Sequence, residues 1–422
     1  MVSTEPPRGM RDLVFEEAQK IRHIEQLFRA HVELAGYNEA ITPIVEEFEL
    51  FSLKSGEEIR NTMYVFLDKA GRELALRPEI TPSIVRLYLN SMQHLPKPVR
   101  LYYIGRVYRY DEPQQGRYRE FRQGGVELLG SDSLYSDVEV LDLLYSFYKR
   151  LGIADDISIK INNIGIYRLL FRKYGINDYL QEHLLHLIDK GKKDEALQIL
   201  QDHVKDSAGI DLATKLIRSE VKMENVDELI SSVNVEGLAE EVERIRKIVQ
   251  VLGSLGVKLN VDLSFVRGLA YYTGVIFEVT HPKVNFSIAG GGRYDGLVEV
   301  YGGPRTPAIG FAIGIERTSA VLNYERKSQP QVVVIALDDS VIDYALVIAN
   351  LLREKGISTL FNVKEQQLGK LLMAYYEQNV KVALIIGTNE KSSQKVTIKD
   401  LSSRTQEVVG IDEILDRLRQ IL

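Results

Sequence analysis

The sequence predicts an α+β protein followed by a separate α/β domain, and three observations lead to this expectation. Residues 1–325 alternate β-forming runs, glycine-rich turns and helical segments. Within them, residues 168–232 show helical spacing of leucine and isoleucine with little β-forming character, which predicts an inserted helical module. Beyond Pro330 the chain alternates strands and helices with short connections, which predicts a mainly parallel sheet.

The composition is that of an ordinary globular protein and excludes several kinds of chemistry. The chain has 422 residues, enough for two or three domains, with 45% hydrophobic and 27% charged residues. The absence of cysteine excludes disulfides, thiolate zinc sites and cysteine nucleophiles, and fits a cytoplasmic location. A net charge of −6 argues against indiscriminate nucleic-acid binding. No apolar run is long enough to span a bilayer and MVSTEPPRGMRD lacks a signal segment, so we expect no membrane partner.

Residues 99–130, VRLYYIGRVYRYDEPQQGRYREFRQGGVELLG, predict two strands joined by a polar loop. Alternation along the second strand places Phe121, Gln123, Gly125 and Glu127 on one face. An aromatic ring, an amide, bare backbone and a carboxylate in a row favour a lined pocket, although a solvated charged hairpin remains an alternative. Arginines outnumber acids here, which favours phosphate binding; they are Arg100, Arg106, Arg109, Arg117, Arg119 and Arg122.

Residues 265–279, FVRGLAYYTGVIFEV, predict a buried strand that is interrupted by polar and flexible residues. Arg267, two glycines, Tyr271 and Tyr272 stand in its middle. One interpretation is an edge strand with a bulge at Gly268 and an arginine that reaches solvent. The other is a binding floor, where backbone approaches a ligand and a fixed cation faces it. The residues alone leave both interpretations open.

Residues 307–317, PAIGFAIGIER, predict a strand with one bulky face and one flat face. Alanine and glycine alternate with isoleucine and phenylalanine. The flat face permits close approach by a planar ligand such as a nucleobase, or equally by a packed helix. Upstream, SIAGGGRYDGL lacks the context of a dinucleotide-binding fingerprint. We predict a turn whose backbone approaches a ligand, with Tyr294 beside it.

The C-terminal residues predict a domain of their own. The polar stretch NYERKSQPQ, at 323–331, predicts a linker, so we place the domains at residues 1–325 and 330–422. QVVVIAL, ISTLFNV and VKVALIIG predict strands, and the residues between them have helical spacing. KVTIKDLSSRTQEVV, which follows, predicts a hairpin.

Taken together, these stretches resemble the class II aminoacyl-tRNA synthetases, and most closely the histidyl-tRNA synthetases. EAITPIVEEFEL (39–50), residues 108–130 and GFAIGIER (310–317) resemble motifs 1, 2 and 3 of that class. VRGLAYYTGVIFE (266–278) and AGGGRYDGL (289–297) resemble segments peculiar to the histidine enzymes. ALRPEITP (75–82) resembles their amino-acid-binding strand end, and PPRGMRD (6–12) their N-terminal signature. The resemblance extends over the whole chain.

The resemblance implies a fold, a reaction and partners. The fold is an antiparallel sheet of six or seven strands that carries the active site, with a helical insertion and a C-terminal anticodon-binding α/β domain. The implied reaction is ATP-dependent ligation of L-histidine to tRNA(His) through a histidyl-adenylate, releasing AMP and pyrophosphate. Magnesium accompanies ATP, no tightly bound cofactor is expected, and the metal ligands are not identified. Motif 1 implies a homodimer.

The resemblance also assigns roles to individual residues. Arg109 and Arg267 match arginines at the α-phosphate, Arg317 matches one near the γ-phosphate, and these three are the implied catalytic residues. Phe121 matches the ring under adenine, and Arg117 is a further candidate for ATP. Gln114 and Arg119 are the candidates for the tRNA acceptor stem. The implied histidine-binding residues are Glu79, Thr81, Gln123, Glu127, Tyr271, Tyr272 and Tyr294.

Two departures and one rival accompany the resemblance. Many relatives have Gly-Thr-Ala where this chain has Ile80, Thr81 and Pro82, and many have aspartate at the position of Ala270. The rival is the regulatory subunit of ATP phosphoribosyltransferase, a histidine-sensing paralogue that usually lacks the anticodon-binding domain and the catalytic arginines. Both features are present here, which favours the synthetase. Tyr271, Tyr272 and Glu127 favour an imidazole over another substrate side chain.

Overall fold

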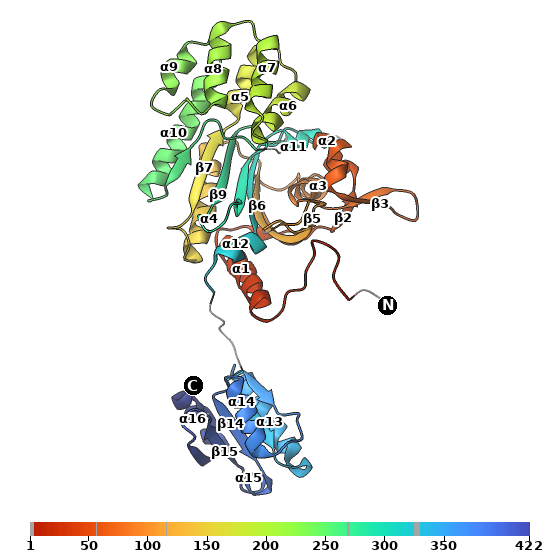
Figure 1. Ribbon diagram of the computed structural model, residues 1–422, viewed down its shortest axis with the longest axis vertical. Coiled ribbons are helices and arrows are strands. Elements are labelled where there is room, and N and C mark those ends of the chain that lie inside the picture. Colours follow the sequence, from red (N-terminus) through yellow and green to blue (C-terminus); the bar gives the residue numbers. More distant parts are fainter. Residues whose placement is uncertain (1–3, 56, 115, 268–270, 325–329) are drawn as a thin grey trace. The chain divides into compact units, whose positions relative to one another are not determined.

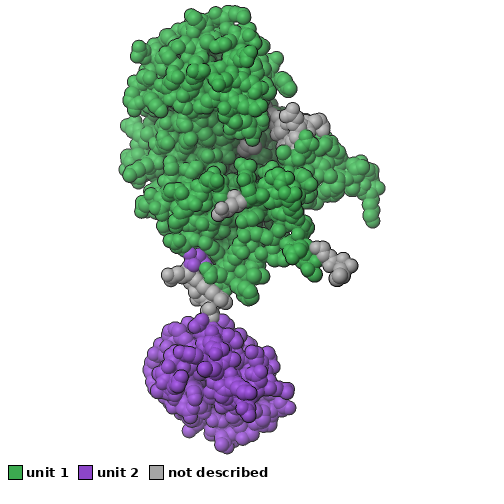
Figure 2. Space-filling model, viewed as in Figure 1, with its two compact units in different colours: residues 1–323 green, residues 324–422 purple. Residues whose placement is uncertain are grey.

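The computed structural model describes residues 4–55, 57–114, 116–267, 271–324 and 330–422. The chain forms two compact units, Met1–Asn323 and Tyr324–Leu422, which Figure 2 distinguishes by colour. The boundary between the units lies between Asn323 and Tyr324. The domain limits taken from the sequence, 1–325 and 330–422, remain predictions. None of the helices in the described ranges combines the length and the apolar character needed to cross a membrane.

The larger unit is built on a sheet whose centre is antiparallel. Within the described residues it has eight strands in the order β1-β5-β6-β11-β10-β9-β7-β8. The strands are β1 (Asn38–Glu39), β5 (Val99–Tyr108), β6 (Glu120–Leu129), β7 (Ser158–Asn163), β8 (Leu259–Val261), β9 (Val275–Thr280), β10 (Ala289–Arg293) and β11 (Ala308–Gly314). The six central strands pair antiparallel, whereas the edge strands β1 and β8 pair parallel with β5 and β7. The predicted antiparallel sheet is therefore present in the six central strands, but the predicted count of six or seven strands was too low, because two short parallel edge strands extend the sheet.

One face of this sheet packs against helices, and the two together form a hydrophobic core. Helices α1 (Phe15–Leu34), α4 (Leu134–Arg150) and α12 (Ile315–Val321) contribute to it. Phe28 of α1 meets Phe147 of α4 edge to face at 5.2 Å, and Phe311 of β11 at 6.2 Å. Ile309 and Ile313 share this core, so the bulky face of β11 is the core face, as its alternation predicts. The flat face of β11 is therefore left for the opposite side of the sheet.

A group of helices interrupts the strand order, as their spacing predicts. Figure 1 shows helices α5 to α9 gathered beyond one end of the sheet, with α10 leading back to it. They are α5 (Gly165–Lys173), α6 (Asp178–Asp189), α7 (Lys193–His203), α8 (Ser207–Ile217), α9 (Val226–Ser231) and α10 (Leu238–Ser254). Leucines such as Leu184, Leu200 and Leu216 are buried between them. We call α5 to α10 the helical segment; it extends beyond both ends of the predicted range 168–232, which stays a prediction.

A small sheet, three short α-helices and one 3-10 helix complete the described part of the larger unit. Strands β2 (Val45–Glu47), β4 (Glu73–Leu76) and β3 (Tyr64–Leu67) pair in the order β2-β4-β3. Helix α2 (Glu49–Ser55) and the 3-10 helix η1 (Glu57–Thr62) lie between β2 and β3 in the chain. Helix α3 (Thr81–Ser91) follows β4 and packs through Ile84 and Tyr88 on the pocket side of the large sheet, and α11 is Leu297–Val300.

The smaller unit has the α/β order that its sequence predicts. Strands β12 (Val332–Ala336), β13 (Thr359–Phe361) and β14 (Val382–Ile386) are parallel. The predicted hairpin, β15 (Lys395–Asp400) and β16 (Gln406–Gly410), adds to β14 antiparallel. Helices α13 (Ile342–Glu354) and α16 (Ile414–Ile421) share one core with the sheet, and α14 (Leu368–Glu377) shares another. Helix α15 (Thr388–Ser393) lies between β14 and β15 in the chain.

Candidate active site

A pocket opens on the flat side of the large sheet and gathers most of the residues singled out in the sequence. Its floor is formed by alternate residues of β6 and β11, whose neighbours point into the core on the other side. Arg267 and Glu79 enter it from segments far apart in the chain. The predicted residues that line it are Glu79, Thr81, Arg109, Phe121, Gln123, Glu127, Arg267, Tyr271, Tyr272, Tyr294 and Arg317.

Glycines in the floor make room for charged side chains that lie across the sheet. A Cβ atom on Gly310 would lie 1.9 Å from Oε2 of Glu127. A Cβ atom on Gly290 would lie 1.5 Å from Nη1 of Arg267. The flat strand faces therefore serve close approach by polar groups in the pocket, and the alternative of a helix packed on them does not apply.

Three arginines converge on one end of the pocket, each held by main-chain carbonyls. Arg109 donates from Nε to the carbonyl of Pro78 at 3.0 Å, and its guanidinium lies 5.4 Å from the ring centroid of Phe121. Arg267 donates from Nη1 to the carbonyl of Phe277 at 3.0 Å. Arg317 donates from Nε to the carbonyl of Gly116 at 2.9 Å and from Nη1 to that of Ser287 at 3.0 Å. Neutral carbonyls fix these groups without cancelling their charge.

The electrostatics of this end favour an anion. Burial, and then the positive charges of Arg109 and Arg117, lower the pKa of Arg317 to about 10. Arg117 is exposed and lines a smaller adjoining pocket together with Arg109, Phe121 and Arg317. Guanidinium groups repel one another when gathered at low dielectric, so an arrangement that holds them together is suited to a polyanionic ligand such as a nucleoside triphosphate.

Two carboxylates, those of Glu79 and Glu127, line the same pocket. Glu127 is 1% exposed and accepts hydrogen bonds from Oγ1 of Thr81 at 2.7 Å, from the hydroxyl of Tyr294 at 2.5 Å and from that of Tyr103 at 3.3 Å. Burial raises the pKa of Glu127 to about 7. Glu79 accepts a hydrogen bond from the hydroxyl of Tyr271 at 2.7 Å, and burial raises its pKa as well. Thr81, which the resemblance places among the histidine-binding residues, makes a shorter hydrogen bond to Glu127 than Tyr103 does.

The remaining walls supply aromatic rings and one unsatisfied acceptor. The rings of Tyr271 and Tyr272 lie 5.1 Å apart, and Tyr294 meets Tyr271 edge to face at 5.9 Å. Oε1 of Gln123 is buried and accepts no hydrogen bond from the described residues. An unpaired buried acceptor is costly, so a ligand that donates a hydrogen bond here would remove that cost.

Tyr103 is a pocket residue that the sequence reasoning missed. It stands opposite Gly125 in the pairing of β5 with β6, and its hydroxyl reaches Glu127 across that glycine. The signal was present, because a hairpin register that pairs Tyr103 with Gly125 puts both on the face of Glu127. The register itself depends on the length of the loop, which the sequence leaves open.

The prediction of a continuous strand over 265–279 was wrong at its N-terminal half. Strand β9 begins only at Val275, and residues 265–267 and 271–274 form no strand. Gly268, where a bulge was considered, and Ala270 lie outside the described residues. Arg267 lines the pocket rather than a solvent-facing sheet edge, which agrees with the binding-floor interpretation.

Gln114 and Arg119, the two tRNA candidates on the hairpin loop, differ in their exposure. Gln114 is exposed and forms an isolated bridge with Arg117. Arg119 is buried: it donates to the carbonyl of Asp111 at 3.0 Å and stacks 4.0 Å from the ring centroid of Tyr110. Gln114 is thus the exposed member of the pair assigned to an RNA partner, whereas Arg119 shapes the loop. The other arginines of the hairpin form ion pairs outside the pocket: Arg100 with Glu139 of α4, Arg106 with Glu120 of β6, and Arg122 with Glu316 of α12.

Comparison with known proteins accounts for both units of the chain. The family model described as Histidyl-tRNA synthetase matches residues 9–318, and the one described as Anticodon binding domain matches residues 331–421. The chain is 56% identical to a histidine–tRNA ligase of Metallosphaera sedula, covering 98% of each chain. It is 52% identical to a histidine–tRNA ligase of Sulfurisphaera tokodaii, covering 100% of each.

Solved structures show the same architecture. The structure of apo histidyl-tRNA synthetase from S. aureus matches with a TM-score of 0.74 and 25% identity, covering 98% of this chain and 99% of that one. The fold is likewise similar to that of a histidyl-tRNA synthetase from Nostoc sp. PCC 7120, with a TM-score of 0.79 and 23% identity over 100% of both chains.

Proposed function

The chain belongs to the histidyl-tRNA synthetase family of class II aminoacyl-tRNA synthetases, and from this premise we propose how its pocket carries out the reaction of that family. The enzyme ligates histidine to tRNA by way of a histidyl-adenylate, using ATP. The observation that supports this assignment of residues is that Arg109, Arg267 and Arg317 converge on one pocket that also holds the buried carboxylate of Glu127.

Histidine occupies the end of the pocket that Glu127 and the tyrosines form. The carboxylate of Glu127 accepts a hydrogen bond from the imidazole N–H, and the rings of Tyr271 and Tyr272 wall the imidazole. Glu79 and the free acceptor of Gln123 receive the substrate ammonium group. An analogue without the imidazole donor would leave a buried carboxylate without that bond, which is a strong basis for selectivity.

ATP lies over the arginine end. Its adenine stacks on Phe121, Arg109 and Arg267 meet the α-phosphate, and Arg317 with Arg117 meets the outer phosphates. The histidine carboxylate attacks the α-phosphorus, the bond to the bridging oxygen breaks, and pyrophosphate leaves with the electron pair. Charge that develops on the phosphate oxygens is met by guanidinium groups that are already in place, which avoids reorganisation during the reaction.

The substrates and the assembly complete the proposal. ATP enters as its magnesium complex, with the ion on the outer phosphates. The adenylate is then attacked by the terminal ribose hydroxyl of tRNA(His), and AMP leaves. Exposed Gln114 on the hairpin loop contacts the acceptor stem. The enzyme acts in the cytoplasm as a homodimer that associates through the region of residues 39–50.

Pyrophosphate exchange with each of the amino acids in turn tests the assignment. We expect ATP formation from labelled pyrophosphate with histidine alone. Histidinol, which keeps the imidazole and the amine but lacks the carboxylate, should compete with histidine without supporting exchange. Histidine binding without exchange would instead support the histidine-sensing paralogue, and exchange with another amino acid would refute the role of Glu127.

A further inference from the structure

The main chain that carries Tyr271 and Tyr272 is bonded directly to the helical segment. We call residues 271–274 the tyrosine turn. The carbonyl of Tyr272 accepts a hydrogen bond from Nε of Arg168 on α5 at 2.9 Å. The carbonyl of Gly274 accepts one from the backbone N–H of Ile164, just before α5, at 2.9 Å. Arg168 is itself held at 2.9 Å by Glu182 on α6, so two helices fix the group that holds Tyr272.

The other side of the turn is bonded to the end of β10. The backbone N–H of Thr273 donates to the carbonyl of Arg293 at 2.8 Å, and its Oγ1 accepts from the backbone N–H of Asp295 at 3.0 Å. Tyr294, the residue between these two partners, donates its hydroxyl to Glu127. The position of the turn and that of Tyr294 are thus set by the same short stretch of chain.

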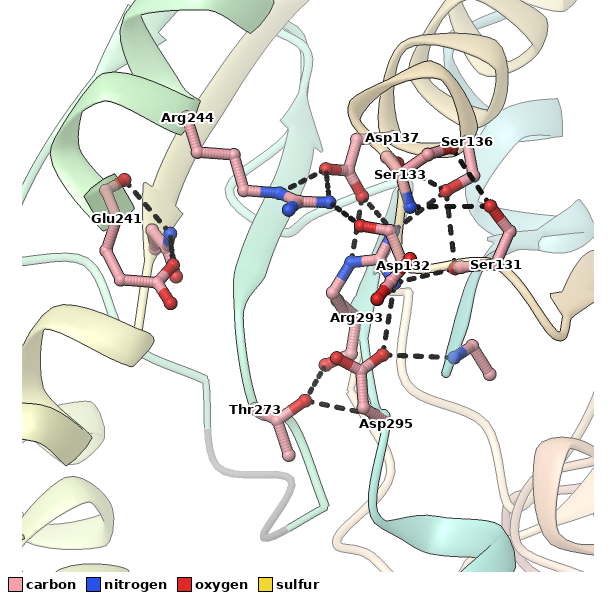
Figure 3. A network of polar contacts seen from close by, with 12 residues as sticks. Ser131, Asp132, Ser133, Ser136, Asp137, Glu241, Arg244, Thr273, Arg293 and Asp295 are labelled. Carbon is pink, nitrogen blue, oxygen red and sulfur yellow. Dashed lines mark hydrogen bonds and ion pairs between the residues drawn. The ribbon is translucent and has the colours of Figure 1, made fainter. Parts of the chain in front are cut away.

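A buried carboxylate connects this stretch to the helical segment, as Figure 3 shows. Asp137 of α4 is fully buried and accepts from Nε of Arg293 at 3.0 Å and from its Nη2 at 2.5 Å. The same carboxylate accepts from Nε of Arg244, on α10, at 2.5 Å. Arg293 also bonds to Asp295 at 3.1 Å. A buried carboxylate shared by two guanidinium groups has little freedom to move, because losing either partner leaves its buried charge less well compensated.

We propose that Arg168 and Arg244 are positioning residues for histidine: through them the helical segment fixes the tyrosine turn, and with it Tyr271 and Tyr272 in the pocket. Arg168 acts on the Tyr272 carbonyl directly, and Arg244 acts through Asp137 and Arg293. Neither arginine is among the residues that line the pocket. The inference rests on the proposed assignment of histidine to this pocket.

The predicted effect is selective for one substrate. The tyrosine turn contributes Tyr271 and Tyr272, which are assigned to histidine. Tyr271 also donates its hydroxyl at 2.7 Å to Glu79, which is likewise assigned to histidine. The arginines at the ATP end are held by carbonyls of other segments, at Pro78, Phe277, Gly116 and Ser287. Loosening the turn should therefore raise the KM for histidine and leave the KM for ATP unchanged.

Arg168→Lys tests the inference in the full-length enzyme. Lysine keeps the positive charge but replaces a forked group by a single ammonium, so it cannot hold the Tyr272 carbonyl and Glu182 in the same geometry. In pyrophosphate exchange we expect the KM for histidine to rise about ten-fold, the order expected when one charge-assisted hydrogen bond is lost. The KM for ATP and the thermal midpoint should stay close to those of the unaltered enzyme.

Arg246→Lys is the matched control. Arg246 lies on α10 as Arg244 does, but its ion pairs are with Asp227 and Glu243 at the surface, so its replacement should change neither KM. If Arg168→Lys does not fold, Arg244→Lys is measured in its place. The same result is expected, a raised KM for histidine with an unchanged KM for ATP. A lowered thermal midpoint with an unchanged KM for histidine, or an equal rise in both KM values, would overturn the inference. Absence of histidine-dependent exchange in the unaltered enzyme would instead refute the proposed function.

Discussion

At the scale of single residues, the chemistry depends on charges placed where water is largely excluded. Glu127 keeps three hydroxyl donors around its carboxylate, yet burial still raises its pKa to about 7. Desolvation therefore outweighs three hydrogen bonds at this position. A carboxyl group that is only partly ionised near neutral pH makes the pocket sensitive to pH.

Glu127→Gln should change how stability depends on pH. The folded chain binds this proton more tightly than the unfolded chain, so Glu127 lowers the free energy of unfolding as pH rises from about 4.5 to 7, and no further above that range. Glutamine cannot ionise, so the variant should not lose this stability. The difference in free energy of unfolding, variant minus wild type, should therefore be about 2 kcal/mol larger at pH 8 than at pH 5. Urea unfolding at both pH values measures this gain.

Tyr103→Phe gives the complementary result for the same carboxyl group. The hydroxyl of Tyr103 is one of the donors that lower the pKa of Glu127, so removing it should raise that pKa further. The stability of Tyr103→Phe should therefore still fall as pH rises, and the fall should continue to a higher pH than in wild type. Parallel pH profiles for Glu127→Gln and wild type would show that Glu127 titrates normally in the folded protein.

Arg267→Ala should slow adenylate formation while leaving the fold intact. Loss of one preorganised donor to a developing oxyanion costs about 10²–10³-fold in the rate. Single-turnover formation of histidyl-adenylate measures the step, and thermal unfolding checks the fold. Arg106→Ala is the control, since Arg106 pairs with Glu120 at 3.1 Å away from the pocket. A near-normal rate for Arg267→Ala would remove it from the catalytic residues.

At the scale of elements, the sequence predicted which face of a strand each side chain lies on better than it predicted where a strand begins. The faces of β6 and β11 follow from a period of two residues, and the structure confirms which side of each faces the pocket. The strand prediction failed at residues 265–267 and 271–274, because β-forming composition is a local property. The tyrosine turn is instead held by Arg168 and Arg293, which are far from it in the sequence. No local pattern contains such contacts.

Gly290→Ala should impair catalysis without unfolding the sheet. The added methyl group would take the space of Nη1 of Arg267, and that flexible group can move aside at little cost to the fold. We expect a loss of adenylate formation of at least about ten-fold, smaller than that of Arg267→Ala because the charge remains in the pocket. Single-turnover rates of both variants provide the comparison.

Gly253→Ala controls for the change from glycine to alanine. A Cβ atom at Gly253, on α10, meets nothing within 4 Å, so activity should be unchanged and stability unchanged or higher. If Gly290→Ala is as active as Gly253→Ala, the close approach of Arg267 to the strand is not needed for catalysis.

At the scale of the whole molecule, the chain combines two units with separate cores, and its larger unit carries an uncovered apolar surface. Pairing of β2, β4 and β3 places five apolar or aromatic residues and Glu47 on one face of the small sheet; the five are Val45, Leu76, Tyr64, Leu74 and Phe66. Val45 is 39% and Phe66 42% exposed. Ile41, in the same stretch that resembles motif 1, is 84% exposed. A sheet face with this many exposed apolar side chains is typical of a surface that is buried by association.

We expect this face to be covered by a second copy of the chain, and Phe66→Asp to weaken the dimer. A carboxylate introduced into an apolar interface would be buried without a partner, so the dissociation constant should rise by at least about a hundred-fold. Sedimentation velocity over a range of protein concentrations measures it. Tyr179→Asp, at an 84% exposed aromatic residue on α6, provides the control and should sediment as the unaltered protein does. A chain that sediments as a monomer at micromolar concentration before any substitution would contradict the prediction, and an unchanged dimer in Phe66→Asp would place the interface elsewhere.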